Sequence, residues 1–114
     1  MNDGLFLRWS AATPDEVKPG VRALVTSMET IEVGVIRLAP GTTLVEHAHP
    51  EEQIFYVLSG RLRYRIGEVE DVAGPGDVIR MPSGAPHAGR VEGDAEAVFV
   101  EVKNRRPAAG SGPA

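Results

Sequence analysis

The sequence predicts an all-β fold in which two antiparallel sheets pair into a barrel of the jelly-roll type. Turn-forming residues recur along the whole chain, with 13 Gly and 9 Pro in 114 residues. The segments between them are short and rich in β-branched and apolar residues, which is typical of strands. No segment has the length and apolar period of an ordinary helix. About eight or nine short strands at this spacing favour two sheets that close on each other, because closure leaves few exposed edges.

Turn signals divide the chain into these strands in order. The signals are Pro19-Gly20, Pro40-Gly41, Ser59-Gly60, Gly74-Pro75-Gly76, the Pro-rich segment 82–86 and Gly93. The strands expected between them are 21–28, 31–38, 43–48, 53–58, 61–66, 69–73, 77–81, 86–91 and 95–103. Together they predict one barrel domain over residues 1–103. The tail 104–114, rich in Pro, Gly and Ala, is expected to be disordered.

Two of these strands have patterns that predict how they are buried. In 61–66 the apolar residues Leu62, Tyr64 and Ile66 alternate strictly with arginines, which predicts one face on the core and one in solvent. Residues 54–58 are apolar on both faces, which indicates a strand covered by the barrel on one side and by a second subunit on the other. We therefore expect a homodimer.

Composition excludes several classes of protein. The chain has 12 Lys and Arg against 16 Asp and Glu, a formal net charge of −4, with no basic patch beyond Arg105-Arg106, so nucleic acid is not expected as the main partner. No apolar run approaches the roughly 18 residues that cross a bilayer, and residues 1–9 lack the layout of a signal peptide, so no membrane association is expected. The absence of cysteine excludes thiolate metal sites and favours the reducing cytoplasm.

The three histidines of the chain are the strongest chemical signal. His47 and His49 are two residues apart, a spacing that puts two side chains on the same face of a strand. Neutral imidazoles that share a face suit a transition metal better than Ca or Mg. Gln53 keeps the same parity if the strand resumes after the intervening turn, so its amide oxygen is a candidate third ligand. His87, after the rigid turn 81–86, is a fourth candidate.

The joint spacing of these residues resembles the two sequence motifs of the cupin family. The first, at 41–60, is Gly41-x5-His47-x-His49-x3-Gln53-x6-Gly60, with Gln where many members have Glu, and the second, within 76–91, is Gly76-x5-Pro82-x-Gly84-x2-His87. The resemblance implies a small cupin-type double-stranded β-helix, usually a homodimer, with a metal site at the mouth of the barrel. It implies one divalent transition metal, Zn, Ni, Fe or Mn, held by His47, His49, Gln53 and His87. Glu51 or Glu52 is an alternative to Gln53 as ligand.

Three further segments resemble the small cupins of pectin breakdown that linearise unsaturated uronates. They are 16–22, 49–53 and the final strand ending Glu101-Val102-Lys103. In that group an acidic residue on the last strand, an aromatic residue and an arginine act on the substrate. The resemblance implies a catalytic role for Glu101 and Arg106 and substrate binding by Arg105, whereas Lys103 replaces the aromatic residue. Phe55, which shares its parity with Gln53, is expected to line the pocket.

The implied ligand set favours non-redox chemistry on a small-molecule substrate. An amide ligand leaves more of the charge of the ion for the substrate than a carboxylate does, which makes the ion a better Lewis acid. Oxygen-activating iron sites generally present two His and one carboxylate. We therefore expect isomerisation, ring opening or cyclisation of a small, oxygen-rich, uronate-like acid, with Glu101 as general acid or base. Two alternatives stay open, a metal-dependent dioxygenase and a non-catalytic module that binds a sugar or another small molecule.

Overall fold

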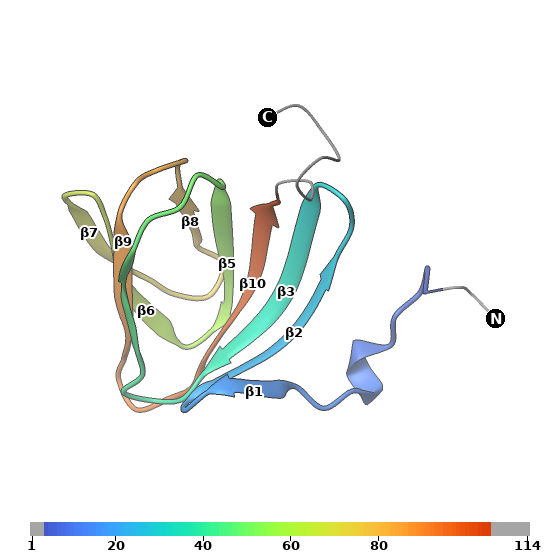
Figure 1. Ribbon diagram of the computed structural model, residues 1–114. Helices are drawn as coiled ribbons and strands as arrows, with labels where there is room; N and C mark the ends of the chain where they lie inside the picture. Colours follow the sequence, from blue (N-terminus) through green and yellow to red (C-terminus); the bar gives the residue numbers. More distant parts are fainter. Residues whose placement is uncertain (1–3, 106–114) are drawn as a thin grey trace.

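The computed structural model describes residues 4–105 and confirms the all-β jelly-roll prediction (Figure 1). A six-stranded antiparallel sheet has the order β1-β2-β3-β10-β5-β8, and a four-stranded antiparallel sheet has the order β4-β9-β6-β7. The strands are β1 (Asp15–Lys18), β2 (Val21–Ser27), β3 (Ile31–Leu38), β4 (Thr43–His47), β5 (Gln53–Ser59), β6 (Arg61–Ile66), β7 (Val69–Ala73), β8 (Val78–Met81), β9 (His87–Glu92) and β10 (Ala97–Asn104). A 3-10 turn, η1 (Trp9–Ala11), precedes them. Within residues 4–105 no helix is long and apolar enough to cross a membrane.

The observed strands match the expected runs except at the ends of the chain and by a few residues at their boundaries. β1 was not expected from the sequence. Its four residues are all exposed, and it pairs with β2 alone. A strand without an apolar face carries no periodic signal, so it could not be found from burial pattern. The last strand runs one residue further than expected, to Asn104. The remainder of the expected tail, 106–114, lies outside the described residues.

The core fills the space between the inner faces of the two sheets. The aromatic residues Phe55 and Phe99 come from the six-stranded sheet and Tyr64 from the four-stranded sheet. The rings of Phe55 and Phe99 have centroids 4.3 Å apart, and those of Phe55 and Tyr64 5.4 Å apart. As expected for β6, Leu62 and Tyr64 are buried, while Arg63 on the outer face pairs with Glu70 at 3.1 Å. These aromatic rings therefore fill part of the barrel interior between the two sheets.

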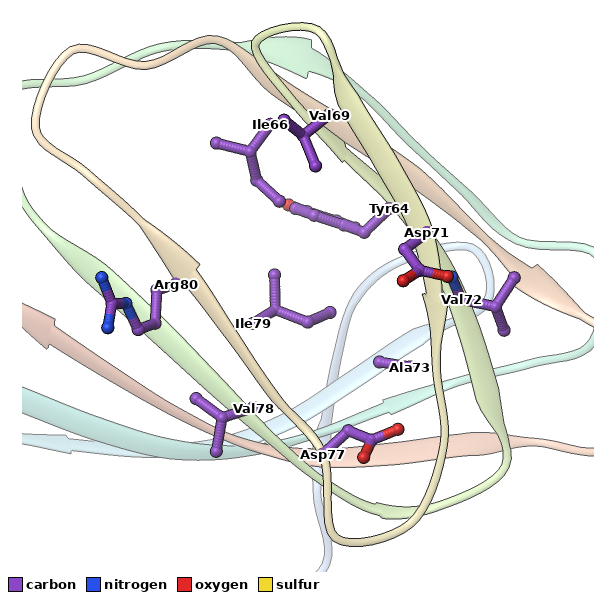
Figure 2. Close-up of a pocket in the computed structure, with 10 residues that line it drawn as sticks. All are labelled: Tyr64, Ile66, Val69, Asp71, Val72, Ala73, Asp77, Val78, Ile79 and Arg80. Carbon is purple, nitrogen blue, oxygen red and sulfur yellow. The ribbon is translucent and has the colours of Figure 1, made fainter.

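A cavity of about 380 Å³ lies at the side of the barrel, between the edge strands β7 and β8 (Figure 2). Its lining includes the inner-face residues Tyr64, Ile66 and Ile79 together with Asp71 and Arg80. The cavity exists because β7 and β8 end their respective sheets without pairing to each other. None of the histidines is among its lining residues.

Candidate metal centre

The three histidines and Gln53 meet where the connection between β4 and β5 crosses from one sheet to the other. His47 ends β4 and is the register partner of His87, the first residue of β9. Gln53 begins β5 in the opposite sheet, and His49 lies in the connection between them. The backbone carbonyl of His49 accepts the N–H of Gly84 at 2.8 Å, which ties this connection to the Pro-rich turn before His87. Both sheets therefore contribute side chains to one site.

The ligand atoms of the three imidazoles all lie within 4.8 Å of one another. The Nε2 atoms of His47 and His87 are 3.1 Å apart, and the ring centroids of His49 and His87 are 4.9 Å apart. His87 is the deepest of the three, with 1% of its surface exposed, whereas His47 is exposed. The cluster therefore has a buried side on the barrel interior and an open side toward solvent.

The Nδ1 atom of each imidazole lies at a backbone carbonyl within two residues of its own position. The Nδ1 distances are 3.1 Å to Val45 O for His47, 2.9 Å to Glu51 O for His49 and 3.0 Å to Ala85 O for His87. A carbonyl can only accept, so each Nδ1 carries the proton and each neutral ring presents a lone pair at Nε2. This is the arrangement by which a metal-binding histidine is oriented through its other nitrogen.

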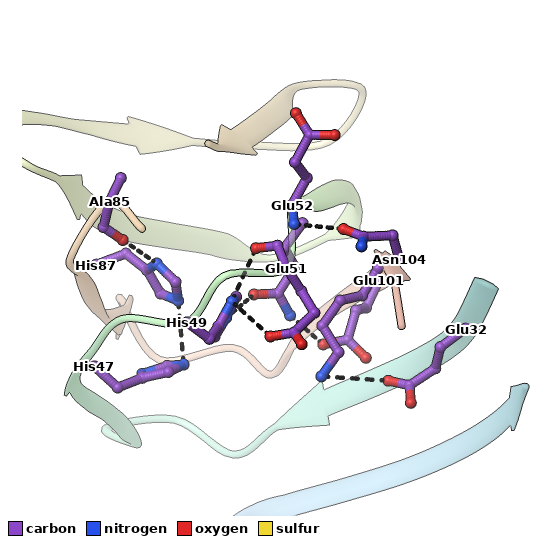
Figure 3. A network of polar contacts seen from close by, with 11 residues as sticks. Glu32, His47, His49, Glu51, Glu52, Ala85, His87, Glu101 and Asn104 are labelled. Atoms are coloured by element: carbon purple, nitrogen blue, oxygen red, sulfur yellow. Dashed lines mark hydrogen bonds and ion pairs between the residues drawn. The ribbon is translucent and has the colours of Figure 1, made fainter. Parts of the chain in front are cut away.

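Gln53 adds an oxygen to these nitrogens. Its Oε1 atom lies 3.1 Å from Nε2 of His49, and its amide N–H donates to the carboxylate of Glu101 on the neighbouring strand β10 (Figure 3). The Glu101 oxygen at this contact accepts, so it selects the amide orientation in which the oxygen of Gln53 faces the histidines. Gln53 is buried, with 6% of its surface exposed, and its contact with Glu101 sets this orientation.

The chemistry of this donor set fits a transition-metal ion. Three imidazole nitrogens and one amide oxygen face one another as acceptors, and the carbonyl and carboxylate contacts behind them take up the available protons. Facing lone pairs repel unless a cation or an extra proton lies between them. Imidazole nitrogen with neutral oxygen is a donor set suited to Zn, Fe, Ni or Cu rather than to Ca.

The surroundings favour neutral imidazole at the deepest ligand. Burial lowers the pKa of His87, and the neighbouring rings of His47 and His49 lower it further, although the carbonyl of Ala85 opposes the shift. The ring of Tyr64 stacks on His87 with centroids 6.0 Å apart. Gly89 makes room for this ring, because a Cβ atom there would lie 2.1 Å from Cδ1 of Tyr64.

A group of charged side chains lies beside the donor set, on the inner face of the six-stranded sheet. Burial raises the pKa of Glu101, and the nearby Glu32 adds to the rise, whereas Lys103 and the amide of Gln53 oppose it. Lys103 Nζ lies 3.7 Å from the carboxylate of Glu32. The negative charge of Glu101 also contributes, after burial, to a raised pKa of the Tyr64 hydroxyl.

The structure does not bring every expected site residue to this centre. Glu51 lies on the Nδ1 side of His49, its carboxylate 3.7 Å from that atom, and Figure 3 shows the Glu52 carboxylate pointing away from the imidazoles. Phe55 is 4% exposed and packs into the aromatic core below Gln53. Its side chain is covered by other aromatic rings, so the structure places it in the core rather than on an open pocket wall.

The structure describes one of the two arginines expected to act on the substrate, Arg105. The guanidinium of Arg105 donates to the carbonyl of Met28, and its backbone N–H donates to Thr30 O at 3.0 Å, so it is held against the hairpin between β2 and β3. Arg106 lies outside the described residues.

Glu32 was not among the expected site residues. It shares the inward parity of Ile36 and Leu38 on β3. A charged residue at a core-facing position is unusual, so this parity was a signal that could have identified it.

Residues 34–103 match the family described as the Cupin domain. The dimethylsulfoniopropionate lyase DddQ of Ruegeria pomeroyi is 33% identical over 63 residues, 54% of this chain and 31% of that protein. The H2HPP isomerase of Bacillus subtilis is 31% identical over 85 residues, 74% of this chain and 36% of that protein. The chain thus spans about a third of the length of these two relatives.

Solved structures share the whole fold. KdgF from Halomonas sp. superposes with a TM-score of 0.82 at 19% identity, covering 92% of this chain and 96% of that one. TT1209 from Thermus thermophilus superposes with a TM-score of 0.72 at 28% identity, covering 82% and 91%. The likeness to KdgF therefore extends over nearly the full length of both chains, and at this identity it establishes the fold.

Proposed function

Because this chain belongs to the cupin family, we propose that it is a metal-dependent enzyme that isomerises, opens or cyclises a small, oxygen-rich, uronate-like acid. The observation that carries the proposal is the pairing of Gln53 with Glu101. It presents a neutral amide oxygen to the three imidazoles and puts a partly buried carboxyl group directly behind it. The ligand set is thus uncharged, and a proton-transfer group lies next to it.

The four facing acceptor atoms would hold one divalent transition metal, Zn, Ni, Fe or Mn. When bound, such an ion would supply a Lewis acid at the mouth of the barrel. The Nδ1 contacts already hold the three rings in the tautomer that ligation requires, so binding needs no change of tautomer at His47, His49 or His87. The uncharged amide of Gln53 adds no negative charge to the ligand set.

Glu101 would hold and move the proton. Its carboxyl group faces the barrel interior beside Gln53, and burial keeps it protonated to a higher pH than an exposed glutamate. A carboxyl group whose pKa is raised in this way is better suited than an exposed glutamate to donate a proton to a substrate atom and to take one back. His87 and Tyr64, which are 1% and 3% exposed, form the buried inner side of the site.

Two comparisons support the non-redox class of reaction. The relatives from Ruegeria pomeroyi and Bacillus subtilis are named as a lyase and an isomerase. The segments 16–22 and 49–53 resemble the cupins that linearise unsaturated uronates, and Arg106 and Arg105 complete that resemblance as candidates for contact with the substrate. The absence of cysteine favours a cytoplasmic site of action.

A turnover assay tests this function. The metal-loaded protein is incubated with a 4,5-unsaturated uronate, and the loss of the ultraviolet absorbance of its conjugated double bond is followed while an oxygen electrode records uptake. We expect loss of absorbance without oxygen uptake, and no reaction after chelator treatment or in a His47→Ala variant. Stoichiometric oxygen uptake would instead identify a dioxygenase, and binding of unchanged substrate would identify a binding module.

We also propose that the enzyme is a homodimer formed through the outer face of the six-stranded sheet. One row of register partners crosses this face and consists of Leu24, Val35, Val100, Tyr56 and Val78. On β5 the outward residues Ile54, Tyr56 and Leu58 are 41%, 45% and 46% exposed in the single chain. A contiguous apolar face of this kind typically forms an interface, and a second copy presents the same face in return.

A further inference from the structure

We propose that Lys103 and Glu32 form a carboxylate-binding subsite at the mouth of the barrel. Lys103 binds the acid group of the substrate, and Glu32 forms an ion pair with Lys103 in the absence of substrate. The inference rests on the proposed function for its class of ligand, a small organic acid. It concerns the residue that this chain has in place of the aromatic residue of the uronate cupins, and it gives that residue a role in substrate choice.

The register of the sheet puts both residues in one row with the metal centre. Lys103 on β10 pairs with Gln53 on β5 and with Glu32 on β3. All three positions share the inward face, because Lys103 has the parity of Glu101 and Phe99, whose side chains face the interior. Lys103 therefore stands one strand away from the amide of Gln53, on the side that faces the open end of the barrel.

The ion pair between Lys103 and Glu32 is loose enough to exchange partners. Its nitrogen and oxygen are 3.7 Å apart, and the side chains are 29% and 22% exposed. Partly exposed ion pairs contribute little to stability, so opening one to bind another carboxylate costs little. The pair is nevertheless inside the mouth, where an ammonium group is less well hydrated and attracts an anion more strongly than on an open surface.

Two carboxyl groups lie close to the single ammonium group of Lys103. One is that of Glu32, its ion-pair partner, and the other is that of Glu101, on the same inward face of β10 and within electrostatic reach of both. A substrate carboxylate therefore competes with Glu32 for the ammonium group. A purely structural cross-strand pair would behave differently, because removing either charge would then only weaken the site.

Opposite effects of two variants test the subsite. Calorimetric titration of the Zn-loaded protein compares D-galacturonate with D-galactose, two probes that differ in the carboxylate. We expect the wild type to prefer galacturonate. Lys103→Met should weaken galacturonate binding about tenfold, Lys103→Arg should retain it, and neither should alter galactose binding. Glu32→Gln should tighten galacturonate binding severalfold, and the double variant should match Lys103→Met.

The gain of affinity in Glu32→Gln is the discriminating result, since a misfolded variant does not bind more tightly. Equal weakening by both single variants, unchanged affinities, or a wild type that binds both sugars alike would overturn the subsite. The uronate turnover assay decides the proposed function separately. Turnover by the wild type together with unchanged galacturonate affinity in Lys103→Met would refute the subsite and leave the enzymatic activity standing.

Discussion

The Nε2 atoms of His47 and His87 lie 3.1 Å apart while the Nδ1 atom of each ring rests on a backbone carbonyl. The two residues are register partners on β4 and β9, so the distance is set by the pairing of the strands and not by a flexible loop. Two lone pairs held this close form half of a coordination site before any ion is added. His49 and Gln53 complete it from the connection to the opposite sheet.

Removing the deepest imidazole should abolish stable metal binding. In His87→Ala we expect metal content after dialysis to fall from about one ion per chain to a small fraction, because the remaining ligands are the more exposed ones. Elemental analysis measures the content and circular dichroism checks the fold. Leu62→Ala is the matched control, since Leu62 is equally buried and carries no ligand atom. Full occupancy in His87→Ala would mean that His87 is not a ligand.

Two substitutions of Glu101 separate its two proposed roles. Glu101→Gln can still accept the amide N–H of Gln53 through its carbonyl oxygen, so metal affinity should stay near that of the wild type while turnover falls about 10²–10⁴-fold. Glu101→Ala removes the acceptor as well, and metal affinity should fall by about 10–100-fold. Competition titration with a chelator and initial rates give the two quantities. Equal metal affinities in both variants would argue against a positioning role.

A carboxylate at position 53 should hold the ion more tightly and react more slowly. Gln53→Glu puts a negative charge among the ligands, so retention of the ion should rise while Lewis-acid chemistry slows. It also puts two carboxylates in contact, because Gln53 now donates to Glu101. The exchanged pair Gln53→Glu with Glu101→Gln restores a donor and removes this repulsion, and should show the tighter retention most clearly. Unchanged or faster turnover in Gln53→Glu would contradict the charge argument.

The apolar outer face of the six-stranded sheet should hold two copies together. Light scattering on the wild type should give about twice the chain mass of 12.2 kDa, and Tyr56→Asp should give a monomer, because a buried unpaired charge is costly. Val69→Asp is the matched control, as Val69 is 71% exposed on β7 of the other sheet. A monomeric wild type would refute this interface.

The strands with one buried face could be predicted from the sequence. β6 is the clearest case, because the alternation of Leu62 and Tyr64 with arginines indicates which face packs against the core. β1 could not be predicted from the sequence, since all of its residues are exposed and its conformation depends on pairing with β2. Two strands begin one residue later than predicted. β9 begins after Pro86, which lacks the N–H needed to pair in a sheet, and β8 begins after Asp77.

The convergence of the candidate ligands was also foreseeable, but their arrangement was not. Parity suggested that His47 and His49 share a strand face, whereas His49 lies beyond the end of β4 and reaches the site through the bend of the connection. The contact between Gln53 and Glu101 depends on the pairing of β5 with β10, which sequence order does not reveal. Glu32 joins the site for the same reason, through β3.

X-ray absorption at the metal edge of the Zn-loaded wild type tests the central claim most directly. We predict one tightly bound ion per chain with only nitrogen and oxygen neighbours at about 2.0–2.2 Å, and with the outer-shell scattering of three imidazoles. The imidazole signal should diminish in His47→Ala. An ion bound without imidazole scattering, or no ion retained by the wild type, would contradict the metal centre on which the proposed enzyme depends.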